Sequence, residues 1–137
     1  MRIKKLELKN FRGFEDLTID FPEGESGLAV FVGVNGSGKT SVLEGIVSLL
    51  NNFLLELTKP ERKGKPLSKS YNPIDGTDVK IGTEKCDIHI VLEFLDIKTT
   101  VDNSIYESGG SVRLRSGEYV EYQRKNIEEI RSKLYHT

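Results

Sequence analysis

The sequence predicts an α/β fold in which a glycine-rich loop joins a buried strand to a long helix, with antiparallel strands beside this core. Three observations predict it. An apolar run at 28–32 leads directly into the glycine-rich segment 33–38. Apolar residues then recur at helical spacing from Val42 to Leu57. Segments of alternating apolar and polar residues lie on both sides of this unit, as half-buried strands require.

Composition bounds the class of protein. The chain has 137 residues, the size of one ordinary domain, and a formal net charge of −1. This charge argues against a generally basic nucleic-acid-binding protein and leaves a local basic patch open. The single cysteine, Cys86, excludes an internal disulfide and is most simply a small buried apolar residue. With no apolar leader and no uninterrupted apolar span, we expect a cytoplasmic protein without a membrane segment.

The first half of the chain supplies the predicted core. Residues 2–10 alternate and predict a strand with one face in solvent, and residues 17–21 alternate in the same way after a turn at 11–14, so a hairpin is expected. The run 28–32 is apolar at each position, which predicts a strand buried on both faces of a central sheet. The helix that follows has so wide an apolar stripe that most of its surface is expected to be covered.

The second half is predicted to be mainly antiparallel. Residues 58–85 hold three of the four prolines and predict an exposed loop or insertion. Residues 86–123 predict strands: a long one over 88–94, a turn at 108–111, and two more at 112–115 and 119–122 around Ser116-Gly117. A helix is expected to start at 124 and to run towards 137. The whole chain, 1–137, is interpreted as one lobe.

The chemistry is carried by residues 33–40, which read GVNGSGKT and match the phosphate-binding pattern G-x-x-x-x-G-K-[ST]. Glycines let the backbone wrap closely around phosphate groups with its N–H groups pointing inward, and the following helix N-terminus adds partial positive charge. Lys39 is expected to reach the β- and γ-phosphates as the catalytic residue, and the Thr40 hydroxyl to ligate Mg²⁺. The motif therefore predicts binding of ATP with Mg²⁺.

The element Asn10–Phe14 (NFRGF), together with residues 31–46 (FVGVNGSGKTSVLEGI), resembles the N-terminus of ABC-type ATPases of the SMC, RecF and OLD group. It is most similar to bacterial AAA-labelled ATP-binding proteins, some of them found in phage-defence systems. The resemblance is sharp over 1–57 and weak over 58–137. It implies an ABC ATPase head fold, in which this chain would be the N-terminal lobe with an antiparallel β subdomain.

The resemblance also assigns site residues. It implies that Arg12 lies over the nucleotide, near its phosphates or base, although a surface arginine in a turn is the alternative. Gln123, expected between a strand and a helix, would be a glutamine that contacts Mg²⁺, or else simply a solvent-exposed side chain. The full set of expected nucleotide-binding residues is Arg12, Gly33, Asn35, Gly36, Ser37, Gly38, Lys39, Thr40 and Ser41, with Thr40 and Gln123 at the metal.

Several parts that this group needs are not found in the sequence. Residues 90–96 (IVLEFLD) are the nearest match to a Walker B strand, but Glu93 interrupts the apolar run, so an alternating strand is the better interpretation. Ser108-Gly109-Gly110 is interpreted as a hairpin turn rather than the start of a signature motif. His89 and His136 lack the context of the switch histidine. We therefore expect the C-terminal lobe, with Walker B and signature motifs, later in the same protein or in a separate chain.

The resemblance implies a nucleotide-dependent homodimer, with DNA or a nuclease as a partner in repair or phage defence. Little or no turnover is expected from this chain alone. A basic cluster in the 58–70 loop would give DNA contacts, although a solvated loop is the simpler interpretation; its members are Lys59, Arg62, Lys63, Lys65 and Lys69. Two alternatives stay open: a non-catalytic nucleotide-sensing lobe, and a small self-contained P-loop kinase or GTPase.

Overall fold

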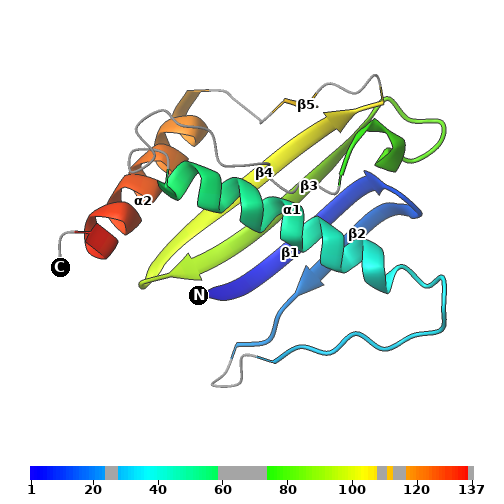
Figure 1. The fold of residues 1–137 in the computed structure, drawn as a ribbon, viewed down its shortest axis with the longest axis horizontal. Helices are drawn as coiled ribbons and strands as arrows, with labels where there is room; N and C mark the ends of the chain where they lie inside the picture. Colours follow the sequence, from blue (N-terminus) through cyan, green and yellow to red (C-terminus); the bar gives the residue numbers. More distant parts are fainter. Residues whose placement is uncertain (24–27, 59–73, 108–110, 113–116, 136–137) are drawn as a thin grey trace.

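The computed structural model describes residues 1–23, 28–58, 74–107, 111–112 and 117–135, with backbone alone at 111–112 and 117–124. A five-stranded antiparallel sheet has the order β2-β1-β3-β4-β5. Its strands are β1 (Arg2–Phe11), β2 (Phe14–Asp20), β3 (Lys85–Phe94), β4 (Ile97–Tyr106) and β5 (Ser111–Val112). Helices α1 (Lys39–Thr58) and α2 (Gly117–Tyr135) pack on one face, and a short 3-10 turn, η1 (Gly76–Asp78), precedes β3 (Figure 1).

The alternating strands form where the sequence predicts them. In the β1–β2 hairpin, Leu6 pairs with Ile19 and Leu8 with Leu17, so each apolar set lies on the same face. The long strand predicted at 88–94 is β3, which pairs along its length with β4. The interpretation of this strand as alternating rather than as a Walker B strand is therefore confirmed.

The hydrophobic core lies between the inner face of the sheet and the two helices. From α1 it contains Val42, Leu49, Phe53 and Leu57, and α2 adds Ile130. Fully burying an aliphatic side chain of this size contributes about 1.5–3 kcal/mol. The sheet contributes Leu6, Leu8, Phe11, Cys86, Ile88, Ile90, Leu92, Ile97, Val101 and Ile105.

The segment after the undescribed residues 59–73 corrects one expectation. Ile74 and Val79 are 3% and 6% exposed and belong to the core. The prediction of an exposed loop over 58–85 is therefore wrong for Ile74 and Val79, whose apolar side chains flank η1 and pack into the core, whereas Asp75 and Thr77 between them are exposed. The bridge between Phe11 and Val79 joins this segment to β1.

The apolar run 28–32 is a second correction. It forms no strand, and Leu28, Val30 and Val32 are 80%, 71% and 91% exposed. In Figure 1 it is an extended trace that passes below β2 and leads towards the start of α1. The sheet of the described residues does not include this run, although Phe31 packs edge-on against Phe21 with ring centroids 6.5 Å apart, so a sequence suited to a central strand lies outside the sheet here.

The α1 helix is covered on one side only, which corrects the expectation that most of its surface is buried. Leu43, Val47 and Leu54 are 51%, 42% and 52% exposed. By length and composition α1 could cross a membrane, a test that core helices also pass. Its contacts with β3, β4 and α2 are those of a core helix.

The C-terminal region contains a fourth correction. Residues 119–122, predicted as a strand, lie inside α2, which begins at Gly117 rather than near 124. Four residues are too few to separate a period of two from one of 3.6. The longer spacing of Val120, Ile127, Ile130 and Leu134 is helical. Of the strand predicted at 112–115, Val112 lies in β5 and residues 113–115 lie outside the described residues.

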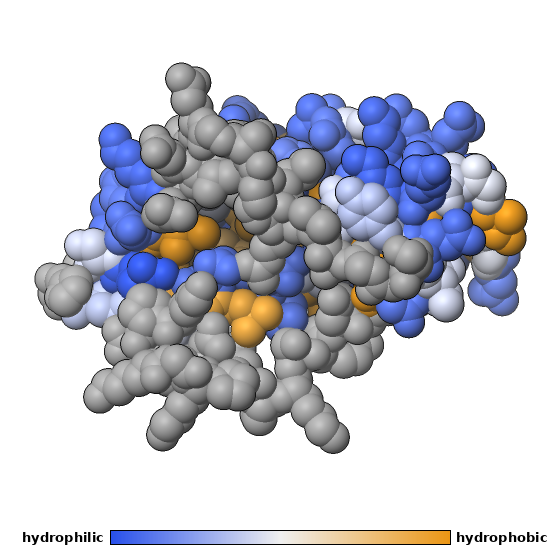
Figure 2. All heavy atoms as spheres, turned by 90° about the horizontal axis from the view of Figure 1, so that it is seen from above, coloured by the Kyte–Doolittle hydropathy of each residue, from blue (hydrophilic) through white to orange (hydrophobic). Residues whose placement is uncertain are grey.

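The face of the sheet opposite the helices is polar. Glu7, His89 and Asp102 stand side by side across β1, β3 and β4, while Val91 is a buried apolar exception. Figure 2 views the molecule from above Figure 1, so it shows an edge of the layers rather than this face; the coloured residues there are mostly hydrophilic, with separate apolar patches.

Candidate functional site

The glycine-rich segment curls into the N-terminus of α1. Gly36 and Gly38 have positive φ angles of 83° and 96°, which residues with a Cβ rarely adopt. The Ser37 N–H donates to the Val34 carbonyl at 3.2 Å, and the Val42 N–H donates to the Gly38 carbonyl at 3.0 Å. Gly38 therefore caps α1, and both glycines stand where the motif needs a tight turn.

Lys39, Thr40 and Ser41 form the first turn of α1, as predicted. Their backbone N–H groups are among those that a helix cannot satisfy internally, and the helix dipole places partial positive charge there. This turn contains no acidic side chain. It is consequently rich in donors and electropositive, which are the properties that bind a phosphate group.

The Lys39 side chain lies back across the loop, where its Nζ donates to the carbonyl oxygen of Gly33. The loop itself is open to solvent. Gly33, Asn35, Gly36 and Ser37 are exposed, as is Thr40, whereas Gly38 and Ser41 are half-buried. The ammonium group thus closes the loop on itself while the backbone around it stays accessible.

Two glycines allow the β1–β2 hairpin to approach α1 closely. A Cβ on Gly38 would lie 2.4 Å from Cζ of Phe14, which requires movement of the aromatic ring or the loop. A Cβ on Gly45 would lie 3.2 Å from Cδ2 of Leu8. Gly38 therefore serves the packing of the hairpin as well as the shape of the loop.

The hairpin turn brings Arg12 to the start of α1. Its Nε donates to Asp78 Oδ1 at 2.8 Å, one terminal nitrogen donates to the Ser41 hydroxyl at 3.2 Å, and the other donates to the Glu44 carboxylate. Partial burial acts to lower the pKa of Arg12, but the bonds to Glu44 and Asp78 outweigh it and raise that pKa. A charged guanidinium therefore lies next to Ser41, joining two residues that the resemblance assigned to one site.

Sequence reasoning missed the two carboxylates that hold Arg12. Asp78 is 66 positions away in the chain and lies in the segment predicted as an exposed loop. The one available signal is its spacing from Asp75, because the two residues form a reciprocal capping box around η1. Glu44 lies one helical turn after the motif, and nothing in the pattern singles it out.

The predicted metal contact of Gln123 loses its structural basis. Gln123 lies inside α2, not between a strand and a helix, and its side chain is not among those described. Asp96 is the last residue of the near match to a Walker B strand. It lies in the turn between β3 and β4 together with Leu95, and both residues have positive φ angles. Ser108-Gly109-Gly110 lies outside the described residues, while β4 and β5 on either side pair antiparallel, as a hairpin requires.

The surroundings of His89 and Cys86 indicate structural rather than catalytic roles. The ring of His89 is hydrogen-bonded to Asp102 on the polar face of the sheet, and this bond is the main reason that its pKa is raised. Cys86 is completely buried, and burial raises the pKa of its thiol to about 11, which leaves it unreactive. No described group of three or more His, Cys, Asp or Glu residues could hold a metal ion.

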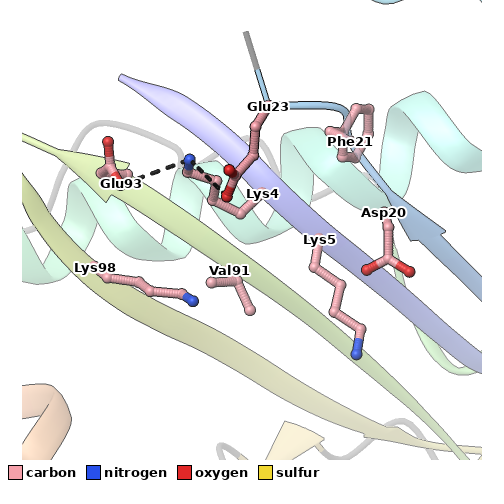
Figure 3. A pocket seen from close by; sticks show the side chains of 8 residues that line it. All are labelled: Lys4, Lys5, Asp20, Phe21, Glu23, Val91, Glu93 and Lys98. Atoms are coloured by element: carbon pink, nitrogen blue, oxygen red, sulfur yellow. Dashed lines mark ion pairs between the residues drawn. The ribbon is translucent and has the colours of Figure 1, made fainter.

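A shallow hollow of about 360 Å³ lies on the polar face, away from the loop (Figure 3). Lys4 bridges Glu23 and Glu93 across it, with Val91 between the charged side chains. These opposite charges largely neutralise one another, so the hollow lacks the excess of donors that a phosphate group needs. The basic cluster at Lys59–Lys69 lies outside the described residues.

Comparison with known proteins agrees with this geometry. The model of the AAA ATPase domain family matches residues 1–136, so the relationship extends well past residue 57. The chain is 50% identical over 62 residues to the DNA replication and repair protein RecF of Lactococcus lactis subsp. cremoris, covering 45% of this chain and 15% of that protein. It is 29% identical over 118 residues to RecF of Carboxydothermus hydrogenoformans, covering 86% and 28%. The chain thus spans less than a third of these relatives.

Solved structures show the same fold. One, described as the structural biochemistry of ATP-driven dimerization and DNA-stimulated activation of SMC ATPases, has a TM-score of 0.57 at 18% identity and covers 93% of this chain and 80% of that one. The recombination mediator protein RecF gives a TM-score of 0.55 at 18% identity, covering 83% and 28%. The chain therefore belongs to the AAA ATPase domain family, as an N-terminal P-loop lobe of the ABC type found in the SMC/RecF group.

Proposed function

We propose that this chain binds ATP with Mg²⁺ and forms the Walker A half of an ABC-type ATPase site. The observation that carries the proposal is the arrangement at the N-terminus of α1. There the glycine loop, Lys39 and Thr40 meet, and Arg12 is held beside Ser41. The Arg12–Ser41 contact favours a nucleotide site over a chance glycine loop, because it brings guanidinium N–H donors from the turn of the β1–β2 hairpin to the same helix end.

The donors present fit ATP with Mg²⁺. Lys39 would hold the β- and γ-phosphates, and the backbone N–H groups of the loop would surround them. The Thr40 hydroxyl is a hard oxygen ligand of the kind that Mg²⁺ prefers, and the bound ion would neutralise phosphate charge. Asn35 and Ser37 would contribute loop contacts, as the resemblance implies. Gln123 stays a prediction from the resemblance alone, because its premise, a preceding strand, is wrong.

The exposed apolar surface supports a second lobe as partner. The run 28–32 and the outer side of α1 expose large apolar residues, which folded proteins rarely leave uncovered over a wide area. A C-terminal lobe, in the same protein or a separate chain, would cover them and supply the Walker B and signature motifs. We accordingly assign ATP hydrolysis to the complete protein, acting as a nucleotide-dependent homodimer, with little or no turnover from this chain alone.

The wider setting follows from the relatives. RecF is named for DNA replication and repair, and the SMC structure is described as dimerising with ATP and responding to DNA. We therefore propose a cytoplasmic role in DNA repair or chromosome maintenance, with DNA as a partner. Phage defence, with a nuclease as partner, is the narrower form of this proposal.

A non-catalytic nucleotide-sensing lobe is the second candidate. The observation that favours it is the end of β3, where the only near match to a Walker B strand turns back into β4. In that case nucleotide would control assembly without turnover. An isolated kinase or GTPase has no comparable observation in its favour.

The test is calorimetric titration of ATP with Mg²⁺ into the chain. Lys39→Ala should weaken binding by at least about tenfold, since it removes a charge-assisted contact. Lys125→Ala is the matched control, because Lys125 is an exposed lysine on α2. Failure of the folded wild-type chain to bind ATP would contradict the proposal for this chain, and equal binding by the Lys39 variant would show that the loop is not the site.

A further inference from the structure

The contact between Arg12 and Asp78 involves backbone as well as side chains. The Arg12 N–H donates to the Asp78 carbonyl at 2.7 Å, and the Lys80 N–H donates to the Asn10 carbonyl at 2.8 Å. The side-chain bond from Arg12 Nε to Asp78 Oδ1, at 2.8 Å, lies beside these two. Asp78 and Lys80 are therefore hydrogen-bonded to the tip of the β1–β2 hairpin through the backbone, and Asp78 also binds the Arg12 guanidinium through its side chain.

Asp78 is itself held in place. Its second carboxylate oxygen accepts the Asp75 N–H at 2.9 Å, and its side chain is only 13% exposed. Ile74 and Val79, on either side of η1, are buried in the core. Movement of the carboxylate away from Arg12 would disturb this packing. The Asp78 side chain is therefore fixed in position, unlike a side chain that makes a solvent-exposed contact.

The backbone conformation of the hairpin turn does not explain why an arginine occupies position 12. Arg12 has a φ of 53°, a left-handed conformation that suits glycine better than a side chain with a Cβ. The guanidinium is nevertheless oriented from three sides, by Asp78, Ser41 and Glu44. A guanidinium has five N–H donors, so these three contacts leave one on the terminal nitrogen at Ser41 and one on the terminal nitrogen at Glu44.

We infer that Asp78 is a positioning residue that holds Arg12 against Ser41, so that the free N–H donors of Arg12 meet the phosphate groups of a nucleotide in the loop. This inference rests on the proposed function, because it concerns the same site. Asp78 itself touches no nucleotide and acts through Arg12. A bidentate or forked donor gains most from such an anchor, because its affinity depends on its orientation.

The experiment measures ATP affinity of the chain, with Mg²⁺, for wild type, Asp78→Asn, Arg12→Ala and the double variant. Asp78→Asn keeps the size of the side chain and should weaken binding by about tenfold, the effect of losing roughly one charge-assisted contact. In the Arg12→Ala background the same change should have no further effect. Asp102→Asn is the matched control, since the Asp102 carboxylate is also largely buried and bonded to a basic side chain, His89, on the opposite face of the sheet.

The outcomes separate this inference from the proposed function. If Lys39→Ala loses binding while Asp78→Asn binds as wild type does, the positioning role is overturned and the nucleotide site stands. Tighter binding by Asp78→Asn would mean that the carboxylate competes with phosphate for Arg12, which also overturns it. Equal losses in the wild-type and Arg12→Ala backgrounds would assign the effect to folding. A wild-type chain that binds no ATP overturns both proposals.

A second readout tests the anchor without nucleotide. In the ¹⁵N NMR spectrum, the Nε–H of Arg12 should be slow to exchange and shifted from the other arginines, because it donates to a mostly buried carboxylate. Arg12→Lys identifies the signal by removing it. Asp78→Ala, which removes the acceptor oxygen, should shift this signal and speed its exchange, and a signal that stays unchanged would contradict the contact.

Discussion

The two sides of α1 are alike in sequence and opposite in environment. On the sheet side, Val42, Leu49 and Phe53 are at most 5% exposed. On the other side, Leu43 and Leu54 are about half exposed, although they follow the same helical spacing. The difference shows that both sides of α1 carry apolar residues suited to burial, but only the side that faces the sheet is buried in this chain. The closed side holds the fold and the Arg12 contacts, and the open side offers apolar surface to a partner.

The largest expected effect contrasts two leucines of α1. Leu49→Ala should lower the free energy of unfolding by about 2–5 kcal/mol, because it leaves a cavity in the core. Leu54→Ala should change it by less than about 0.5 kcal/mol, because that side chain is half in solvent. Urea unfolding followed by circular dichroism measures both. Similar losses for the two variants would mean that the outer side of α1 is covered in the isolated chain, for instance by self-association.

The next effect concerns the close approach of the hairpin to α1. Gly38→Ala should destabilise the chain by about 1–3 kcal/mol, because the new Cβ meets Phe14 at a backbone angle that suits glycine. Gly13→Ala is the matched control, since a Cβ there meets nothing within 4 Å and its φ is not positive. Thermal unfolding of both variants decides the point. A stable Gly38→Ala chain would show that the contact with Phe14 yields easily.

The smallest effect lies on the polar face of the sheet, away from both sides of α1. His89 has a raised pKa in the folded chain, chiefly through its bond to Asp102, so its ion pair stabilises the fold fully below the ordinary value of 6.5. That contribution is lost as the pH rises through the folded pKa. The urea midpoint should therefore fall between pH 6 and pH 8 by more in wild type than in His89→Gln.

His136→Gln is the control for this prediction, because it removes the only other histidine of the chain. It should keep the pH dependence of wild type. If His89→Gln and wild type lose stability in parallel, other groups cause the dependence, and the bond to Asp102 contributes little to folding.

Local patterns predicted the elements whose partners are close in the chain. The β1–β2 hairpin, β3 and the start of α1 at Lys39 follow from alternation, helical spacing and the glycine motif. These signals suffice because a hairpin pairs neighbouring segments and a helix bonds within itself. The prediction of a strand at 119–122 was wrong, because four residues are too few to distinguish the two-residue period of a strand from the 3.6-residue period of a helix.

The failures that matter for the site involve distant partners. Asp78 is joined to Arg12 across 66 positions, and its segment reads locally as a polar loop with a capping box. The run 28–32 was expected to be a buried strand because it is apolar throughout, yet it lies outside the sheet of the described residues. Apolar composition indicates that a segment is suited to burial, but it does not indicate which element packs against that segment.

The sequence by itself determined the glycine-rich loop, the helix that follows it and the hairpin that precedes it. The tertiary structure alone decided that Arg12 lies at Ser41, that Asp78 anchors it and that α1 keeps one side open. The physical reason is the range of each interaction. Backbone geometry and side-chain periodicity act over a few residues and are visible in the order of the chain. Ion pairs and burial depend on which surfaces meet, and the chain order does not contain that information.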